Sequence, residues 1–244
     1  MRSSDAIDEL KARADPVARA AMARFGIRGE GVLGGSPVPH LRRMARALGR
    51  DHGVAEELWS SGIHEARLLA TPVDEPAKVT PAQMERWAAD CDSWDLVDGA
   101  CLNLFWRTPH AWDAVERWSG RRDEFVKRAA FALMAALAVR HAAAPDERFV
   151  RLLGLVEREA ADARNVVRKA VNWALRQIGK RNSTLHAAAI ESAERILRDG
   201  PRSARWVASH ALRELRTERV SAAVGSRRQR GRPAKRAAAE GPAG

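Results

Sequence analysis

Cysteine is scarce in this sequence, where Cys91 and Cys101 are the only two among 244 residues. Their spacing fits no zinc site, and two cysteines cannot form a disulfide framework, so we expect a reducing compartment. The seven histidines are scattered and form no His-Glu-x-x-His or Cys-x-x-Cys pattern. We therefore expect no metal site, and nothing in the sequence indicates a cofactor.

Long apolar runs are absent as well. No uninterrupted stretch approaches the roughly 18 residues that a membrane span requires. The first residues lead into a charged amphipathic segment instead of the apolar core of a signal peptide. These two absences predict a soluble protein of the cytoplasm without membrane contact.

Common catalytic loops are missing too. The glycine-rich stretch 31–35 is not followed by the Lys-Ser or Lys-Thr pair of a phosphate-binding loop. No Gly-x-Ser-x-Gly segment offers a serine nucleophile. Nucleotide hydrolysis of the phosphate-loop type and serine-hydrolase chemistry are thereby excluded.

Positive charge is what the sequence has in excess. It contains 42 Lys and Arg against 31 Asp and Glu, which gives a net charge of +11 and an isoelectric point near 10.9. Such a balance favours a polyanionic partner, nucleic acid ahead of an anionic membrane, although a GC-rich genome also raises the arginine content. Hydrophobic residues make up 45%, enough for a substantial core.

Helix-forming residues dominate the chain. Alanine is abundant, β-branched residues are sparse, and strand-like alternation is not evident, which predicts an all-α fold. Glycine and proline punctuate the pattern, including Gly34-Gly35-Ser36-Pro37, Thr71-Pro72 and Gly200-Pro201. The predicted helices cover 4–24, 39–49, 53–60, 63–71, 80–90, 94–106, 110–118, 121–140, 146–160, 163–180, 183–198 and 202–216.

A weak internal repeat underlies these helices. Val126-Lys127-Arg128-Ala129 recurs as Val167-Arg168-Lys169-Ala170, and Ala174-Leu175-Arg176 recurs as Ala211-Leu212-Arg213, each roughly 40 residues later. Helix pairs at this period predict a HEAT-like α-solenoid of stacked antiparallel pairs, and we expect a monomer. A generic helical bundle, whose alanine-rich helices look alike by chance, is the alternative.

The character of the sequence changes near residue 221. Residues 225–244 hold six Lys and Arg and one Glu, with no apolar periodicity. We therefore divide the chain into a helical domain at 1–220 and a disordered basic tail at 221–244. Arg230-Gly231-Arg232-Pro233 in the tail matches the core of an AT-hook, in which an extended Arg-Gly-Arg enters the narrow minor groove of A·T tracts. A generic basic tail is the alternative.

The segment Ser93-Trp94-Asp95-Leu96-Val97-Asp98 reads as the first turns of a helix with Ser93 at the N-cap. Trp94 and Asp98 are four residues apart, so both project from one face. A flat ring can pack on a sugar while the carboxylate meets a developing positive charge. The alternative for Asp98 is an ordinary acid that favours the helix N-terminus, a role that Asp95 fits better.

A second tryptophan lies among cations. Lys169, Trp173, Arg176 and Lys180 share one helical stripe, which can hold phosphates while the ring lies against a sugar or base. Trp173 could equally be a core residue beside solvated cations. The remaining tryptophans are more typical of helix packing, and they are Trp59, Trp87, Trp106, Trp112, Trp118 and Trp206.

Arg128 lies on another predicted helix, and it too has both a structural and a functional interpretation. Its neighbours Phe131, Leu133 and Met134 have the pattern of a core face. A surface arginine is most often solvated or paired with an acid, but its guanidinium can also hold a phosphate through two parallel hydrogen bonds.

These residues together carry a resemblance to a known family. The chain resembles the AlkD-type DNA glycosylases of the bacterial DNA alkylation repair family, which are HEAT-like repeat proteins, over about residues 20 to 215. The resemblance lies in the segment 93–98, in Val126-Lys127-Arg128-Ala129-Ala130, and in 167–176 around Trp173. One departure is Ser93, because the family example has a tryptophan pair where this chain has Ser93-Trp94.

The resemblance implies an activity and a set of site residues. Asp98 would be the catalytic carboxylate, Trp94 and Trp173 would flank the deoxyribose, and Arg128 would contact the adjacent phosphate. The substrates would be cationic N3- and N7-alkylated purines in double-stranded DNA, which makes the protein a monofunctional hydrolase. The further expected DNA contacts are Lys127, Lys169, Arg176, Lys180, Arg230 and Arg232.

Two other classes of protein compete with this interpretation. Some relatives in the wider family bind DNA without robust excision, and a fold alone does not establish an activity. A helical-repeat protein can also serve as a scaffold, whose inner face would then be acidic or apolar.

Overall fold

The computed structural model describes residues 1–230, with side chains as far as Ser226, and every regular element in that range is helical. The first seven α-helices are α1 (Ser3–Ala12), α2 (Pro16–Arg24), α3 (Val38–Leu48), α4 (His52–Ser60), α5 (His64–Val73), α6 (Pro81–Asp90) and α7 (Trp94–Asn103). A short 3-10 helix, η1 (Phe105–Arg107), precedes α8 (Ala111–Ser119), α9 (Glu124–Arg140), α10 (Asp146–Glu159), α11 (Asn165–Gly179), α12 (Ser183–Asp199), α13 (Arg202–Leu215) and α14 (Glu218–Arg230).

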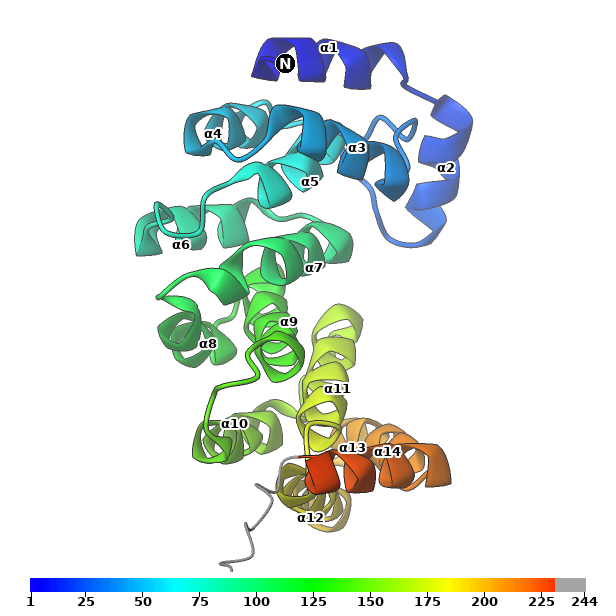
Figure 1. Ribbon diagram of the computed structural model, residues 1–244. Coiled ribbons are helices and arrows are strands. Elements are labelled where there is room, and N and C mark those ends of the chain that lie inside the picture. The colour runs from blue at the N-terminus through cyan, green and yellow to red at the C-terminus, as the bar shows by residue number, and fades with distance from the viewer. Residues whose placement is uncertain (231–244) are drawn as a thin grey trace, which may run out of the picture.

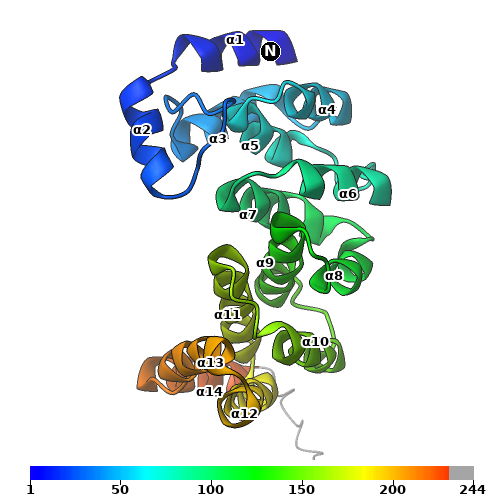
Figure 2. The same cartoon turned by 180° about the vertical axis from the view of Figure 1, so that it is seen from behind.

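The helices stack into a curved column with two rows. Consecutive members of the row α3, α5, α7, α9, α11 and α13 contact one another, whereas α4, α6, α8, α10 and α12 lie along the other side (Figure 1). Both ends of the column, α2 and α13–α14, project on the side of α7, α9 and α11 (Figures 1 and 2). This inner row therefore lines the concave side, as the predicted HEAT-like α-solenoid requires.

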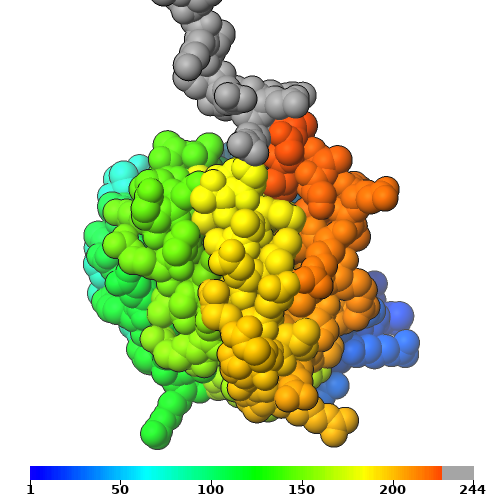
Figure 3. Space-filling view, turned by 90° about the horizontal axis from the view of Figure 1, so that it is seen from below, coloured from blue at the N-terminus to red at the C-terminus, as the bar shows by residue number. Residues whose placement is uncertain are grey.

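The C-terminal helices close one end of the column. Seen from below, α10 and α12 lie beside the orange C-terminal helices, and the blue N-terminal segment projects past them (Figure 3). The small side chains of the inner row allow close packing, and in α9 every residue from Val126 to Ala138 is buried. Trp59 and Trp87 stack at 4.0 Å between ring centroids inside the core, and Trp118 is also buried. Packing was the predicted role of these three rings.

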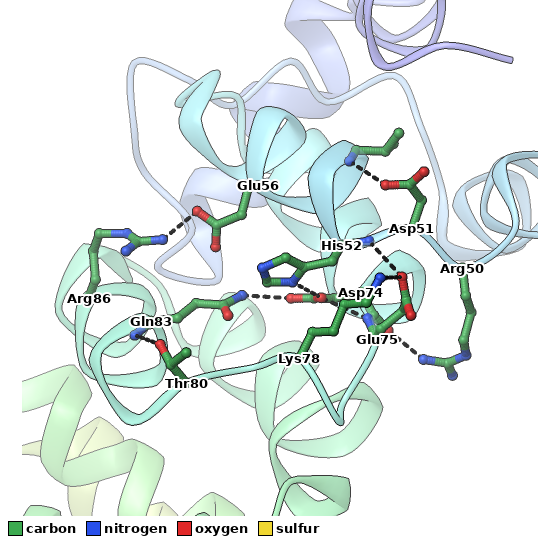
Figure 4. A network of polar contacts seen from close by, with 11 residues as sticks. Arg50, Asp51, His52, Glu56, Asp74, Glu75, Lys78, Thr80, Gln83 and Arg86 are labelled. Carbon is green, nitrogen blue, oxygen red and sulfur yellow. Dashed lines mark hydrogen bonds and ion pairs between the residues drawn. The ribbon is translucent and has the colours of Figure 1, made fainter.

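A buried carboxylate ties neighbouring repeats together at the end of α5. Asp74 accepts hydrogen bonds from His52 Nδ1 at 2.7 Å and from Gln83 Nε2 at 2.6 Å (Figure 4). Its backbone carbonyl accepts a hydrogen bond from Arg50 Nη1. Because a buried charge requires such partners, this network fixes α4, α5 and α6 relative to one another.

Several boundaries differ from those predicted, and three of the differences have a clear physical cause. The single helix predicted over 4–24 is two helices, because Asp15 caps α2 by accepting from the Val17 N–H at 2.8 Å and Pro16 occupies the first helical position. The break predicted at Thr71-Pro72 lies inside α5. The Thr71 hydroxyl donates to the Leu68 carbonyl at 2.9 Å, the acceptor that the missing Pro72 N–H leaves open.

The third difference is at the C-terminus. The helical part continues past the predicted boundary at residue 220, because α14 runs to Arg230. Val220 and Val224, one turn apart, are buried against the core. The rest of the predicted tail, 231–244, lies outside the described residues. No helix in the described part of the chain is long and apolar enough to cross a membrane.

Candidate nucleic-acid site

The site begins at the first turn of α7. Ser93 occupies the predicted N-cap position, although its hydroxyl accepts no capping hydrogen bond. Asp95 turns toward α5, where its Oδ2 lies 2.9 Å from Nε2 of the buried His64. Trp94 and Asp98 share the other side of the helix, as the four-residue spacing predicts.

Arg128 on α9 holds the Asp98 carboxylate through both oxygens. Nη2 lies 2.9 Å from Oδ2, and Nε lies 3.2 Å from Oδ1. Nη1 of the same guanidinium donates to the Val166 carbonyl at 2.6 Å, in the first turn of α11. Arg128 thus joins the N-terminal ends of three consecutive inner helices.

The pair is largely withdrawn from water. The Asp98 side chain is 18% exposed and that of Arg128 is 7% exposed. Burial raises the pKa of the Asp98 carboxyl above its ordinary value, and the charge and hydrogen bonds of Arg128 oppose that rise. Asp98 is therefore a poorly hydrated carboxylate that keeps its charge next to a guanidinium.

Trp94 forms one wall of the opening above Asp98. Its indole is 36% exposed and donates from Nε1 to the Phe25 carbonyl at 3.0 Å. The Phe25 ring itself is 73% exposed, directly after α2. Phe25 could not be predicted here because its partner Trp94 lies 69 residues further along the chain and no local pattern links the two.

Trp173 and Lys169 on α11 complete the opening. Together with the groups already described they line a cavity of about 460 Å³, here called the Asp98 cavity. Its lining comprises Phe25, Trp94, Asp98, Arg128, Asn165, Val166, Lys169, Trp173 and Arg176. The structure therefore brings together, around one hollow, all four residues predicted to carry the chemistry.

The remaining predicted contacts are placed differently. Arg176 lines the cavity but pairs with Glu214, and Lys180 lies 2.7 Å from the other oxygen of that carboxylate, outside the cavity. Lys127 does not join the site, because its Nζ is enclosed by Glu159 at 2.5 Å and Asp162 at 3.0 Å. Its ammonium is buried and paired with these two carboxylates, so it is not available to contact DNA, contrary to the prediction. Arg230 ends α14 with its side chain undescribed, and Arg232 lies outside the described residues.

The solenoid and its cavity define a helical-repeat protein with an aromatic, charged opening at the ends of its inner helices. The sequence profile of the DNA alkylation repair enzyme family matches residues 6–215, so the chain belongs to that family and is a DNA repair protein. This match confirms the resemblance inferred from the three motifs.

Comparison with solved structures supports the fold. One protein superposes with a TM-score of 0.71 at 18% identity, over 88% of this chain and 95% of its own. It is described as one of "a new family of proteins related to the HEAT-like repeat DNA glycosylases with affinity for branched DNA structures". A designed armadillo repeat protein in complex with a (KR)4 peptide aligns over 77% of this chain and 80% of its own at 13% identity, with a TM-score of only 0.33. No curated protein matches the chain.

Proposed function

We propose that this protein is a monofunctional alkylpurine DNA glycosylase that hydrolyses the N-glycosidic bond of cationic N3- and N7-alkylated purines in duplex DNA. The observation that carries the proposal is the Asp98 cavity, where one carboxylate lies between two accessible indoles. The family of DNA alkylation repair enzymes supports the substrate class.

The chemistry follows from the leaving group. A purine alkylated at N3 or N7 is already a cation. It becomes neutral when the bond to C1′ breaks and the bonding electron pair moves to the base nitrogen. No general acid is needed for this departure. The sugar is left as an oxocarbenium-like cation, which the Asp98 carboxylate stabilises while orienting a water molecule. The water oxygen bonds to C1′ and releases its proton, which leaves an abasic sugar.

The aromatic residues also stabilise the positive charge that develops on the sugar. Indole faces attract cations, so Trp94 and Trp173 favour the oxocarbenium-like sugar over the neutral one. A lesion that leaves without protonation requires no tight base pocket, whereas excision of uncharged bases usually depends on base flipping. The Asp98 cavity, which offers one carboxylate and two indoles, meets this requirement.

The cations around the cavity bind the DNA backbone. In the free protein Arg128 holds Asp98 through Nε and Nη2 and donates from Nη1 to the Val166 carbonyl. In the complex with DNA, the second Nη1 hydrogen contacts the phosphate beside the lesion. Lys169 is exposed at the cavity and takes a further phosphate. Such contacts release counterions from DNA, so binding weakens steeply as salt rises.

The rate of excision is expected to fall at acidic pH because only the ionised Asp98 stabilises the sugar cation. Burial raises the pKa of this carboxyl from its ordinary value of 3.8, so the loss begins at a higher pH than for an exposed aspartate. Single-turnover rates on methylated duplex, corrected for protein-free release, measure the profile. A rate that stays constant down to pH 4 would contradict a role for the Asp98 charge.

A second candidate function is binding of DNA structures without excision. Two observations favour it: Asp98 is already engaged in an ion pair with Arg128 in the free protein, and the structural relative at TM-score 0.71 is described as having affinity for branched DNA. Release of 3-methyladenine or 7-methylguanine from methylated duplex decides between the two candidates.

We further propose that the basic C-terminal segment tethers the protein to DNA, with Arg230 and Arg232 in the minor groove. Ending the chain after Ser226 keeps the buried Val220 and Val224 and removes the six basic residues that follow. We expect affinity for undamaged duplex to fall by about tenfold at low salt, with the choice among lesions unchanged. Equal affinity at every salt concentration would refute the tether.

The variant Gly231→Ala/Pro233→Ala is the matched control for the AT-hook. It keeps every charge but alters the extended backbone that an AT-hook needs. A true AT-hook loses its preference for A·T-rich duplex in this variant, whereas a generic basic tail does not.

A further inference from the structure

The inner helices end at a second hollow, on the opposite edge of the solenoid from the Asp98 cavity. It has a volume of about 880 Å³ and lies among the segments that follow α5, α7 and α9. The aromatic and basic side chains of its lining are Trp106, Arg107, Trp112, His141 and Arg148. We call this hollow, defined by those five residues, the rim hollow.

Two half-buried indoles in the rim hollow each carry a guanidinium over the ring. Arg107 Cζ lies 5.2 Å from the Trp106 centroid, and Arg148 Cζ lies 4.8 Å from the Trp112 centroid. The Trp106 ring is also fixed by its Nε1, which donates to the Leu102 carbonyl at 3.1 Å. Flat cationic surfaces held in this way are suited to stacking with bases and to contact with phosphates.

The cations of the rim hollow have no acidic counterparts. Among the described residues, neither Arg107 nor Arg148 is within ion-pair distance of a carboxylate, and the same holds for the neighbouring Arg140. No carboxylate belongs to the lining. Arg50 donates to the Asp74 carbonyl, because the Asp74 side chain is already engaged by His52 and Gln83 (Figure 4).

This concentration of positive charge is unfavourable in the free protein. Burial, followed by the charges of Arg50 and Arg140, lowers the pKa of the Arg107 guanidinium. An anion in the rim hollow would relieve the repulsion. Other exposed arginines also lack an acidic partner, but Arg107 and Arg148 are set apart because they line one hollow together with two indoles.

We propose that the rim hollow binds an unpaired strand of DNA that extends from the duplex held at the Asp98 cavity. Arg107 and Arg148 contact its phosphates, and its bases stack on the Trp106 and Trp112 surfaces. The inference rests on the proposed function, since it assumes that duplex DNA occupies the concave side.

The inner helices connect the two sites. Trp94 and Asp98 lie at the start of α7, and Trp106 and Arg107 follow its end. Arg128 lies near the start of α9, and His141 follows that helix. A ten-residue helix such as α7 is about 15 Å long. An unpaired arm of a few nucleotides can therefore reach the rim hollow from the Asp98 cavity.

Binding of a forked duplex by the full chain tests the proposal. The probe carries unpaired thymidine arms, and a blunt duplex of the same paired sequence is the reference. For Arg107→Gln/Arg148→Gln we expect affinity for the fork to fall about tenfold, to the level of the blunt duplex. Affinity for the blunt duplex should change less than about twofold. Both side chains are exposed, so an unchanged melting temperature verifies the fold.

The matched control is Arg117→Gln/Arg151→Gln. It removes two exposed arginines from the same two helices, α8 and α10, that carry Trp112 and Arg148. This control should lower affinity for fork and blunt duplex by the same small factor. An equal loss for both probes in Arg107→Gln/Arg148→Gln, or no loss for the fork, would overturn the rim hollow as a strand site.

Failure of this inference can be told apart from failure of the proposed function. If the rim hollow binds nothing, wild-type protein still binds blunt methylated duplex and releases its alkylated bases, but shows no preference for the fork. If the proposed function is wrong, base release is absent whatever the shape of the probe.

Discussion

Asp98→Asn is expected to reduce excision of 7-methylguanine by about 10²–10³-fold or more while leaving duplex affinity nearly intact. Removing one preorganised electrostatic group from a reaction centre has an effect of this size. Asparagine matches aspartate in shape and still offers an oxygen to Arg128, so the Asp98 cavity keeps its form. The negative charge that meets the sugar cation is lost. Single-turnover base release and fluorescence anisotropy measure the two quantities separately.

Asp92→Asn provides the control for this variant. Asp92 is exposed, lies just before α7, and is not part of the Asp98 cavity. The same change of charge at Asp92 should leave the excision rate within about twofold, because exposed charges outside the site act weakly through solvent. A normal single-turnover rate for Asp98→Asn would remove that carboxylate from the mechanism.

The second large effect is expected at Arg128. Arg128→Ala leaves the Asp98 carboxylate buried without its partner and breaks the link to the Val166 carbonyl. Breaking a buried ion pair on one side costs about 3–5 kcal/mol of unfolding free energy, unless the acid takes up a proton. Losing the guanidinium moves the pKa of Asp98 further upward, so the loss of excision at acidic pH shifts to higher pH. Denaturant unfolding and the pH–rate profile measure these effects.

A double-mutant cycle makes the Arg128 prediction specific. In Asp98→Asn/Arg128→Ala the uncompensated charge is gone, so the unfolding free energy should recover part of what Arg128→Ala loses. Strictly additive losses of stability would show that the two side chains are not energetically coupled. They would then contradict the claim that Arg128 is what keeps Asp98 charged in a poorly hydrated site.

The sequence was sufficient for the features that depend on local pattern. The positions of Trp94 and Asp98 on one helical face follow from their spacing alone, and the structure has them there. The repeat around Arg128 and Lys169 indicated consecutive stacked helices, and α9 and α11 are indeed neighbours in the inner row. The Asp15-Pro16 capping signal is equally local, but it lies within a long alanine-rich stretch whose pattern favours a single helix.

Features set by distant partners could not be predicted. Lys127 has the sequence context of a surface cation, but Glu159 and Asp162 reach it from the end of α10 and the turn that follows. Phe25 enters the site through a loop whose carbonyl meets Trp94. None of these contacts leaves a periodic signal in the sequence.

The central claim is that the Asp98 cavity breaks glycosidic bonds. Its most direct test is incubation of the full chain, in excess, with duplex DNA containing 7-methylguanine, followed by chromatography of the released bases. The account predicts free 7-methylguanine and an equal number of abasic sites, at a rate far above release without protein. Stable binding of the methylated duplex with no base release would contradict it and leave a DNA-binding protein.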